Sequence, residues 1–277
     1  MTTPVTDPAT SRPSIMGIVN VTPDSFSDGG RLASAQAAVD HGLGLVAQGA
    51  DILDIGGEST RPGAEPVDVQ DEMDRVVPVI QSLRATWSGP ISIDTMKPQV
   101  ARAAVAAGAT LWNDVTALSF SPESPAVAAD LACDVVLMHM QGQPQTMQLD
   151  PAYDDVLVEV SAWLAARAEA AMSAGVAHDR IWLDPGIGFG KTVDHNLALT
   201  NGLDRIRTLG FPVLYGASRK RMIQRIDPSA SDPADRLGGS LALALAAARN
   251  GAAIIRVHDV RETVQALKVQ TALAQAR

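Results

Sequence analysis

Short apolar runs alternate with longer amphipathic segments along almost the whole chain. The segments between the runs repeat apolar residues at helical spacing, as Val39, Leu43 and Val46 do in the first of them. Glycines stand shortly before several runs, where left-handed residues commonly end helices. This alternation predicts repeated strand–helix units around a parallel sheet. The eight predicted strands are 15–20, 51–57, 91–95, 111–115, 135–139, 181–184, 212–218 and 253–258, and the predicted helix-ending glycines are Gly49, Gly108, Gly175, Gly210 and Gly251.

The number and length of these units indicate the overall architecture. The chain has 277 residues, of which 46% are hydrophobic, and this is enough for one large core. Eight strand–helix units in about 250 residues are typical of a (β/α)8 TIM barrel, and an open doubly wound sheet is the alternative. We predict a disordered tail at 1–13 and a single catalytic barrel domain, of the α/β class, at 14–277.

Polar side chains stand at the ends of most of the predicted strands. A parallel barrel brings these ends to one mouth, where TIM-barrel active sites lie. A single Asp or Asn at a strand end is often only the N-cap of the next helix, and Asp94 fits that alternative. A whole set of such side chains would be costly to bury without a ligand, so the set predicts a polar ligand. Its members are Asn20, Asp94, Asn113, Asp184, Ser218, Arg256 and His258.

The types of side chain at the predicted mouth indicate the chemistry of the ligand. The carboxylates of Asp94 and Asp184 and the amide of Asn113 can hydrogen-bond a flat, donor-rich heterocycle, as side chains read the edges of nucleic-acid bases. Lys220 follows Ser218 closely and adds a cation for a ring carbonyl or an aromatic acid. The alternative for Lys220 is a solvated lysine in a basic turn.

A second set of basic side chains predicts an anion site. Arg256 and His258 stand two residues apart in the last predicted strand, which places them on the same face. Together with Arg61 they make a clamp that is suited to phosphate. A lone strand histidine is more often structural, and the neighbouring arginine favours a role in binding.

Three loops after predicted strands are longer or richer in glycine than ordinary connections, which take about two to six residues. The first carries one isolated aromatic residue, Phe26, and the second combines glycines with a hydroxyl, a charge and a rigid proline. The third displays Phe189 but lacks the spacing of the Rossmann and Walker phosphate loops. These loops are 20–30, 56–63 and 184–191.

The composition disfavours several classes of partner. The chain has 22 Lys and Arg against 31 Asp and Glu, a net charge of −9, which disfavours nonspecific binding to nucleic acid or to an anionic membrane. No apolar run approaches the roughly 20 residues of a membrane span, and the start lacks the layout of a signal peptide. We expect the single cysteine, Cys133, to be structural, because no base stands near it in a motif. A reducing cytoplasm is the expected location.

The combined motifs resemble those of the dihydropteroate synthase family from residue 17 to about residue 263. The resemblance implies a TIM barrel that joins 6-hydroxymethyl-7,8-dihydropterin diphosphate to p-aminobenzoate and releases pyrophosphate in folate synthesis. Each motif is short, but a chance match of so many in the right order is implausible. The motifs are 20–30, 57–63, 92–95, 113–115, 137–140, 184–191, 216–220 and 256–260.

Carried over position by position, the resemblance implies a role for each residue of the site. The pterin would be held deep in the barrel by Asp94, Asn113, Asp184, Gly216 and Lys220, with Val115 and Met138 as apolar walls. The diphosphate would contact Asn20, Thr60, Arg61, Arg256 and His258, with Mg²⁺ held partly by Asn20. The p-aminobenzoate would lie among Phe26, Arg61, Pro62, Phe189, Ser218 and Lys220, with its carboxylate at Ser218 and the helix N-terminus that follows.

The resemblance also implies how the reaction proceeds. It suggests a dissociative substitution in which the bond to diphosphate breaks first and the amine then attacks a cation. The residues implied in catalysis are Asp28, which would steady the cation, and Lys220, Arg256 and His258. The part of the first loop from Val21 to Gly30 would act as a mobile lid, and Phe26 would then form a wall of the p-aminobenzoate pocket.

Two other functions and one assembly stay open at this point. A pterin-dependent methyltransferase has a similar set of Asp and Asn residues but no need for the phosphate clamp. An inactive paralogue would bind pterin without turnover. Apolar helical surface at 237–248 and 260–273 exceeds what one barrel contact needs, and family members pair through this region, so we expect a homodimer.

Overall fold

The computed structural model describes residues 12–21, 30–59, 65–143 and 146–276, and for 30–34 the backbone only. Its strands form one sheet in which all neighbouring strands are parallel, in the order β6-β5-β4-β3-β2-β1-β8-β7. A bridge between Leu183 and Val213 joins the two edges of this sheet, so the barrel closes. The strands are β1 (Ser14–Asn20), β2 (Ile52–Gly56), β3 (Ile91–Asp94), β4 (Leu111–Asp114), β5 (Asp134–Met138), β6 (Ile181–Asp184), β7 (Leu214–Tyr215) and β8 (Ile254–Val257).

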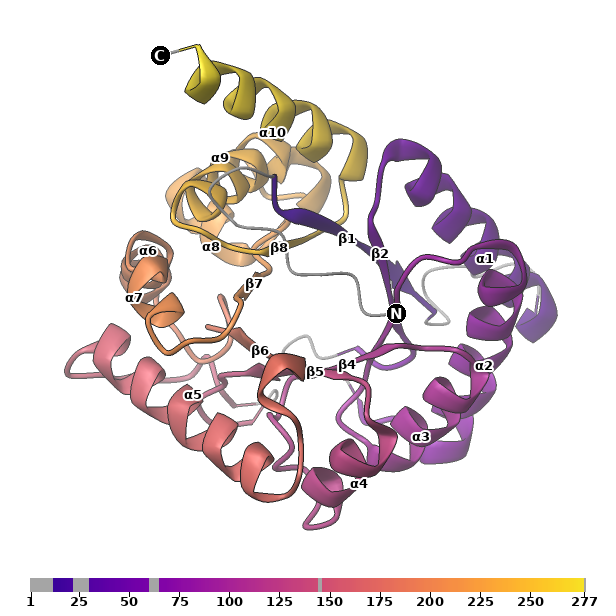
Figure 1. Cartoon of the computed structure of the whole chain (residues 1–277). Coiled ribbons are helices and arrows are strands. Elements are labelled where there is room, and N and C mark those ends of the chain that lie inside the picture. The colour runs from indigo at the N-terminus through magenta and orange to yellow at the C-terminus, as the bar shows by residue number, and fades with distance from the viewer. Residues whose placement is uncertain (1–11, 22–29, 60–64, 144–145, 277) are drawn as a thin grey trace.

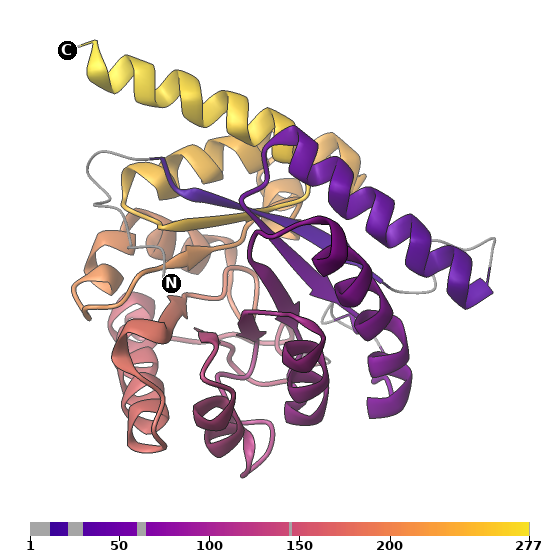
Figure 2. The same cartoon turned by 45° about the vertical axis from the view of Figure 1, so that its right-hand side comes forward.

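A ring of helices surrounds the barrel (Figure 1). Figure 2 shows the same arrangement obliquely, with the helices covering the outer face of the strands. The predicted TIM barrel is therefore confirmed. The helices are α1 (Gly30–Gln48), α2 (Val69–Thr86), α3 (Pro98–Ala107), α4 (Ser124–Leu131), α5 (Val156–Ser173), α6 (Val193–Asn201), α7 (Leu203–Arg207), α8 (Arg221–Ile226), α9 (Leu237–Arg249) and α10 (Val260–Gln275). Two short 3-10 helices lie at His178–Arg180 and Pro233–Arg236.

The helix-ending glycines lie where the sequence predicts them. All five have positive φ angles, between 86° and 118°. At Gly108 the backbone N–H turns back to the carbonyl oxygens of Ala104 and Val105 and ends α3. An L-residue adopts this conformation only at a cost in free energy, which explains why glycine occupies these positions.

Strand β7 is shorter than predicted. The apolar run predicts a strand over 212–218, but regular pairing covers only Leu214–Tyr215. The chain turns just beyond, and Arg219 takes a left-handed conformation with φ of 58°. The residues after Tyr215 therefore form the start of a loop at the barrel mouth.

Side chains fill the barrel interior in layers. One apolar layer takes a buried residue from each of six strands, with Trp182 of β6 packed against it. Successive strand residues point to opposite faces, so the residue two positions further along each strand also points inward. This rule places the next layer nearer the C-terminal ends of the strands. The apolar layer consists of Met16, Ile52, Leu111, Val136, Leu214 and Ile254.

The larger core lies between the strands and the helices. It includes fully buried Trp112 and Tyr215, together with the apolar faces of α2, α3 and α5. Burial of this apolar surface is the main favourable term in folding. No helix in the described ranges is long and apolar enough to cross a membrane.

Candidate active site

The inner layer next to the mouth is polar. Moving two residues along from the apolar layer leads from Ile52 to Asp54, from Leu111 to Asn113 and from Ile254 to Arg256. The same step on β6 leads from Trp182 to Asp184. All four side chains are largely buried, with Asp54 fully inaccessible to solvent. The barrel geometry thus gathers the polar strand ends, as the sequence predicts.

Arg256 lies at the centre of this polar layer. Its Nε donates to Asp54 Oδ2 at 2.6 Å, and its Nη2 donates to Asp94 Oδ2 at 2.6 Å. Asn113 Nδ2 donates to the same Asp54 oxygen at 3.2 Å. Residues from β2, β3, β4 and β8 therefore form one hydrogen-bonded network. In this network Arg256 is paired with two carboxylates.

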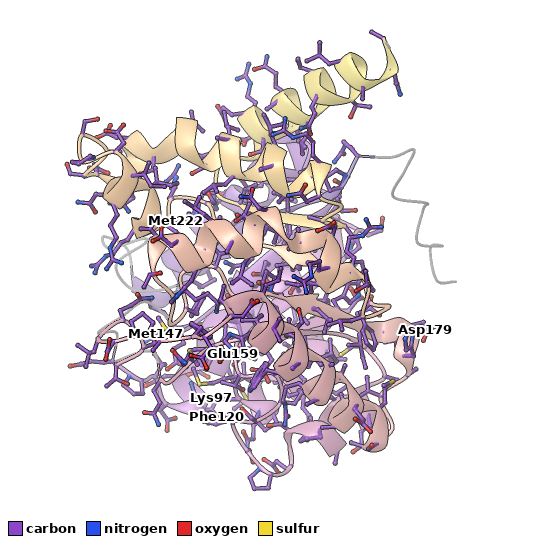
Figure 3. All side chains as sticks on the ribbon, turned by 90° about the vertical axis from the view of Figure 1, so that its left-hand side faces the viewer. Lys97, Phe120, Met147, Glu159, Asp179 and Met222 are labelled. Carbon is purple, nitrogen blue, oxygen red and sulfur yellow. The ribbon has the colours of Figure 1, made fainter. Side chains whose placement is uncertain are left out.

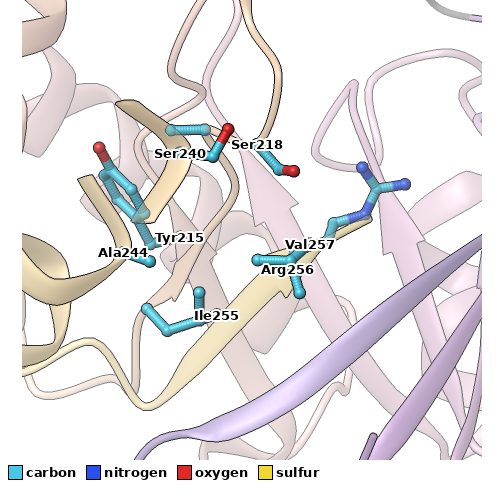
Figure 4. A pocket seen from close by; sticks show the side chains of 8 residues that line it. Tyr215, Ser218, Ser240, Ala244, Ile255, Arg256 and Val257 are labelled. Carbon is cyan, nitrogen blue, oxygen red and sulfur yellow. The ribbon is translucent and has the colours of Figure 1, made fainter. Parts of the chain in front are cut away.

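Figure 4 shows how strand alternation aims Arg256. Ile255 and Val257 lie on the side of Tyr215 and Ala244, whereas the guanidinium of Arg256 reaches away from that pocket. The burial pattern of β8 agrees, since Ile255 and Val257 are buried in the outer core. One arginine in an apolar strand thus places a cation inside the barrel.

Burial shifts the pKa values of these groups. Desolvation raises the pKa of Asp94 to about 7, although the charge of Arg256 opposes the shift. Desolvation also raises the pKa of Asp184, and the charge of Lys220 opposes it. For Arg256, desolvation lowers the pKa, but the charges of Asp54 and Asp94 outweigh it and the net shift is upward. Arg256 therefore stays protonated, whereas Asp94 titrates near neutrality.

Two of these carboxylates have an oxygen that is buried without a hydrogen-bond partner among the described residues. These atoms are Asp54 Oδ1 and Asp94 Oδ1. An unpaired buried carboxylate oxygen is costly, and a donor from a ligand removes that cost. The Asp94 side chain is 14% exposed, so it borders the open mouth of the barrel. The capping alternative for Asp94 is wrong, because the N-cap of α3 is Lys97 and Asp94 pairs with Arg256.

The loop after β6 carries the next group of site residues. Asp184 Oδ1 accepts a hydrogen bond from the Gly186 backbone at 2.7 Å and fixes the start of the loop. The ammonium of Lys220 donates to the carbonyl of Ile187 and lies 4.4 Å from the ring centroid of Phe189. Cation–π contact of this kind fixes the two side chains relative to each other. Desolvation lowers the pKa of Lys220 to about 8, against the charge of Asp184.

A buried lysine, Lys191, hydrogen-bonds the backbone of the same loop. Lys191 is 1% exposed, and its Nζ lies 2.9 Å from His139 Nδ1 and donates to the Phe189 carbonyl at 2.9 Å. Desolvation lowers the pKa of Lys191 to about 7 and, with the nearby lysine charge, lowers that of His139 to about 3. The Tyr153 hydroxyl donates to the Gly190 carbonyl at 2.8 Å. These contacts determine where Phe189 is held.

The end of the barrel at β7 and β8 holds a serine and a histidine together. Ser218 Oγ lies 3.0 Å from His258 Nδ1 and accepts a hydrogen bond from the His258 backbone at 3.2 Å. Arg219 next to it pairs with Asp259 through Nε at 3.0 Å and through Nη2. The two loops that carry Ser218 and His258 are therefore tied to each other.

A buried ion cluster lies outside the barrel interior. Lys97 Nζ is 2.5 Å from both Glu58 Oε2 and Glu72 Oε2, and Glu58 Oε1 accepts from the Val67 backbone at 3.0 Å. A cavity of about 490 Å³ adjoins this cluster and is lined by Lys97 and Phe120, which Figure 3 labels, and by Val115 and Trp163 among others. Desolvation raises the pKa of Glu72, against its hydrogen bond to Lys97.

The remaining predicted site residues are distributed as follows. Val115 and Met138 are buried near the ends of β4 and β5, and Gly216 follows β7. Asn20 ends β1 beside Gly56 of β2. The predicted residues Phe26, Asp28, Thr60, Arg61 and Pro62 lie outside the described residues, as do residues 1–11 of the predicted tail. Arg12, which the prediction also puts in the tail, pairs with Asp51 at 2.7 Å.

Three buried residues of this region, Asp54, His139 and Lys191, are not among the predicted site residues. Asp54 is an acid in the middle of a strand that is otherwise apolar, two residues before the strand end, and counting inward positions would have found it. His139 and Lys191 lie inside motifs that carry the resemblance, but no local pattern predicts that they pair. Which ligand group each predicted site residue binds stays a prediction.

The fold and the polar inner layer together define the chain as a TIM-barrel enzyme with polar side chains gathered at the mouth of the barrel. The model of the pterin binding enzyme family matches residues 16–258. The dihydropteroate synthase of Escherichia coli strain K12 is 46% identical over 267 residues, 96% of this chain and 94% of that protein. The chain therefore belongs to the pterin-binding enzymes and, among them, to the dihydropteroate synthase family, whose members are transferases.

Solved structures agree with this membership. A Xanthomonas albilineans dihydropteroate synthase with 4-aminobenzoic acid is 52% identical, with a TM-score of 0.89 over 95% of this chain and 93% of that one. A structure of dihydropteroate synthase from the same organism in complex with 7,8-dihydropteroate is 49% identical, with a TM-score of 0.86 over 95% and 94% of the two chains.

Proposed function

We propose that this chain condenses 6-hydroxymethyl-7,8-dihydropterin diphosphate with p-aminobenzoate to give 7,8-dihydropteroate and pyrophosphate. One observation carries the proposal beyond family membership. The inner layer at the mouth combines carboxylates, an amide and the cation of Arg256, the ammonium of Lys220 interacts with Asp184 and Asp94, and Asp94 Oδ1 is left without a partner among the described residues. Such a surface suits a flat heterocycle that donates hydrogen bonds along one edge and carries an anion at one end.

The pterin lies in the barrel interior in this proposal. Asp94 and Asp184 accept hydrogen bonds from its N–H groups, and Lys220 donates to its ring carbonyl. Asn113 directs its Nδ2 to Asp54, which leaves its Oδ1 as an acceptor for the ligand. Val115, Met138 and Gly216 are the remaining contacts, and the two apolar side chains pack against the ring faces.

The diphosphate lies against Arg256 and His258, with Thr60 and Arg61 expected to complete its site. Asn20 fits a Mg²⁺ ion, because its side-chain oxygen stands at the mouth beside Gly56, which has no side chain to cover it. Mg²⁺ commonly takes one or two protein oxygens and fills its other positions with water and substrate phosphate. When bound, it supplies positive charge that stabilises the leaving diphosphate.

The p-aminobenzoate lies over the loop after β6. Phe189 and the stem of Lys220 form one side of its pocket, as the 4.4 Å cation–π contact supports. Its carboxylate faces Ser218, which His258 already orients. Phe26, Arg61 and Pro62 are the predicted residues of the other side.

The proposed chemistry is a dissociative substitution. The C–O bond to diphosphate breaks with both electrons going to oxygen, and a cation delocalised over the dihydropterin forms. The amine of p-aminobenzoate then attacks the methylene carbon and releases its proton. Arg256 and His258 stabilise the leaving charge, which is the main electrostatic contribution of the protein. Asp28 is proposed to steady the cation, and closure of the first loop to exclude water.

The proposal needs no protein nucleophile. Among the described residues, the buried amine of Lys191 and the thiol of Cys133 are held away from the proposed ligands. Lys191 is 1% exposed and bonded to the loop. Cys133 is buried, and desolvation raises the pKa of its thiol to about 11, as the structural prediction requires.

One assay tests this function. Purified protein should release pyrophosphate only when the pterin diphosphate, p-aminobenzoate and Mg²⁺ are all present, and a sulfonamide should compete with p-aminobenzoate. Release without the amine, or methyl transfer from a methylated pterin, would favour the methyltransferase. Pterin binding without any release would indicate an inactive paralogue.

We also propose that two chains form a homodimer through α9 and α10. Two apolar residues of α10 support this assembly: Val269 is 55% exposed and Leu273 is 67% exposed. The single cysteine is free and buried, which supports a location in the reducing cytoplasm. Fractionation of cells that express the chain with an epitope tag tests that location, and the tagged chain should be found in the cytoplasmic fraction.

A further inference from the structure

Arg256 is held by two carboxylates that differ in how a ligand can reach them. Asp94 is 14% exposed on its side chain, and its second oxygen has no partner among the described residues. Asp54 is fully buried behind it and lies 2.6 Å from Arg256 Nε. A ligand in the barrel mouth can therefore compete with Arg256 for Asp94 but not for Asp54.

The guanidinium has two usable edges. Its Nε and Nη2 atoms point along one edge, and these are the atoms that bond Asp54 and Asp94. No bond from Nη1 is formed with the described residues. A phosphate group accepts well from a guanidinium edge, so the remaining donors are suited to the diphosphate of the substrate.

We propose that Asp54 is a positioning residue that holds Arg256 by its Nε atom while the Nη atoms of Arg256 bind the diphosphate of the pterin substrate. This inference rests on the proposed function and names a residue that acts through Arg256 rather than by touching substrate. Asp54 is the fixed attachment of the guanidinium, and Asp94 is the partner that is shared with the pterin. Asp54 also accepts from Asn113 at 3.2 Å, a longer contact than the 2.6 Å contact to Arg256. Loss of the Asp54 charge should therefore weaken binding of the pterin ring less than binding of the diphosphate.

The test compares two ligands of the full-length protein by isothermal titration calorimetry. One ligand is the pterin diphosphate with Mg²⁺, and the other is 6-hydroxymethyl-7,8-dihydropterin, which lacks the diphosphate. Asp54→Asn keeps the size of the side chain and removes its charge. We expect it to raise the Kd of the diphosphate ligand about 10- to 100-fold and that of the alcohol by no more than about 3-fold.

Ser92→Ala is the matched control. Ser92 pairs in register with Asp54 on the next strand and is equally buried, and its hydroxyl has no partner among the described residues. It should change neither Kd. A double-mutant cycle gives the second measurement: in an Arg256→Ala background, Asp54→Asn should change the Kd of the diphosphate ligand by less than about 3-fold.

Equal losses for both ligands, or no loss for either, would overturn the assignment of Asp54. A loss of the same size in the Arg256→Ala background would also overturn it, because the effect would not pass through Arg256. Both ligands bind the same folded protein, so partial unfolding of a variant raises both apparent Kd values by the same factor. After correction for the folded fraction, measured by circular dichroism, a less stable variant still gives an answer. If the wild-type chain releases no pyrophosphate and does not prefer the diphosphate ligand, the proposed function fails, and this inference fails with it.

Discussion

At the scale of single residues, Asp94 and Lys220 titrate near neutrality because burial disfavours the charged form of each. The pKa of Asp94 is raised to about 7 and that of Lys220 is lowered to about 8. In the proposed site Asp94 must be ionised to accept from the pterin, and Lys220 must be protonated to donate to it. We therefore expect kcat/KM for the pterin substrate to rise with pH through about 7 and to fall above about 8.

Lys220→Arg tests the basic limb of this profile. Arginine stays protonated throughout, so the fall above about pH 8 should disappear even if the maximum rate is lower. Ser92→Ala should keep both limbs. A fall that stays near pH 8 in Lys220→Arg would assign that limb to another group.

The stability of the fold should depend on pH through Lys191. Burial lowers its pKa from 10.5 to about 7, so between these values the unfolded chain binds more protons than the folded one. The free energy of unfolding therefore rises with pH over this interval. We expect Lys191→Met to reduce this rise by at least about 1 kcal/mol between pH 7 and pH 10.

Urea unfolding of the wild type and of Lys191→Met at several pH values measures the difference. Titratable groups that do not interact with Lys191 cancel in that comparison. Parallel curves would show that Lys191 is protonated in the folded chain throughout, and would contradict the lowered pKa.

At the scale of elements, the loop after β6 depends on glycine at defined positions. Gly186, Gly188 and Gly190 have φ angles of 67°, 82° and 63°. A Cβ on Gly186 would overlap the carbonyl oxygen of His139. Gly186→Ala should therefore displace the loop that carries Phe189, destabilise the protein by about 2 kcal/mol or more, and lower activity strongly.

Gly44→Ala is the control for this substitution. Gly44 lies inside α1, where an added Cβ would meet no atom within 4 Å, and alanine should stabilise the helix by roughly 0.5–1 kcal/mol. Thermal unfolding and pyrophosphate release of both variants give the comparison. A Gly186→Ala protein with wild-type activity would show that the loop conformation does not matter to the site.

Most elements could be predicted because each depends on a local pattern. Apolar runs give the strands and glycines give the helix ends. At β2, β3 and β8, five of the six predicted strand boundaries lie one residue from the observed ones, and the start of β3 coincides with the predicted one. The bounds of β7 could not be predicted, since its end depends on where β8 stops pairing with it and on the left-handed turn at Arg219. The residues of β8 that set this pairing lie in another part of the chain.

In the candidate site, too, local sequence patterns predict some features and distant parts of the chain determine the others. Strand-end polar residues could be found from sequence because their position alone marks the mouth of a barrel. The partner of each could not, since Arg256 meets Asp54 across 202 residues of chain and Lys191 meets His139 across 52. Asp54 stands inside an apolar run, and only the inward count across all strands distinguishes it from a core residue.

At the scale of the whole molecule, the closed barrel leaves α10 with more apolar surface than the barrel covers. Gln270 Nε2 donates to the Leu245 carbonyl at 3.0 Å and packs α10 against α9, while Val269 and Leu273 remain 55% and 67% exposed. In a dimer these side chains would be buried, and a charge there would be desolvated at a high cost in free energy. We expect wild-type protein to sediment as a dimer and Leu273→Asp to shift it toward monomer.

Val158→Asp is the matched control, because Val158 is 49% exposed on α5, outside the proposed interface, and should leave the dimer intact. Sedimentation velocity over a range of concentrations measures both. A wild-type monomer, or a Leu273→Asp dimer as tight as wild type, would contradict an interface at α10, and a monomeric Val158→Asp would move the interface to α5.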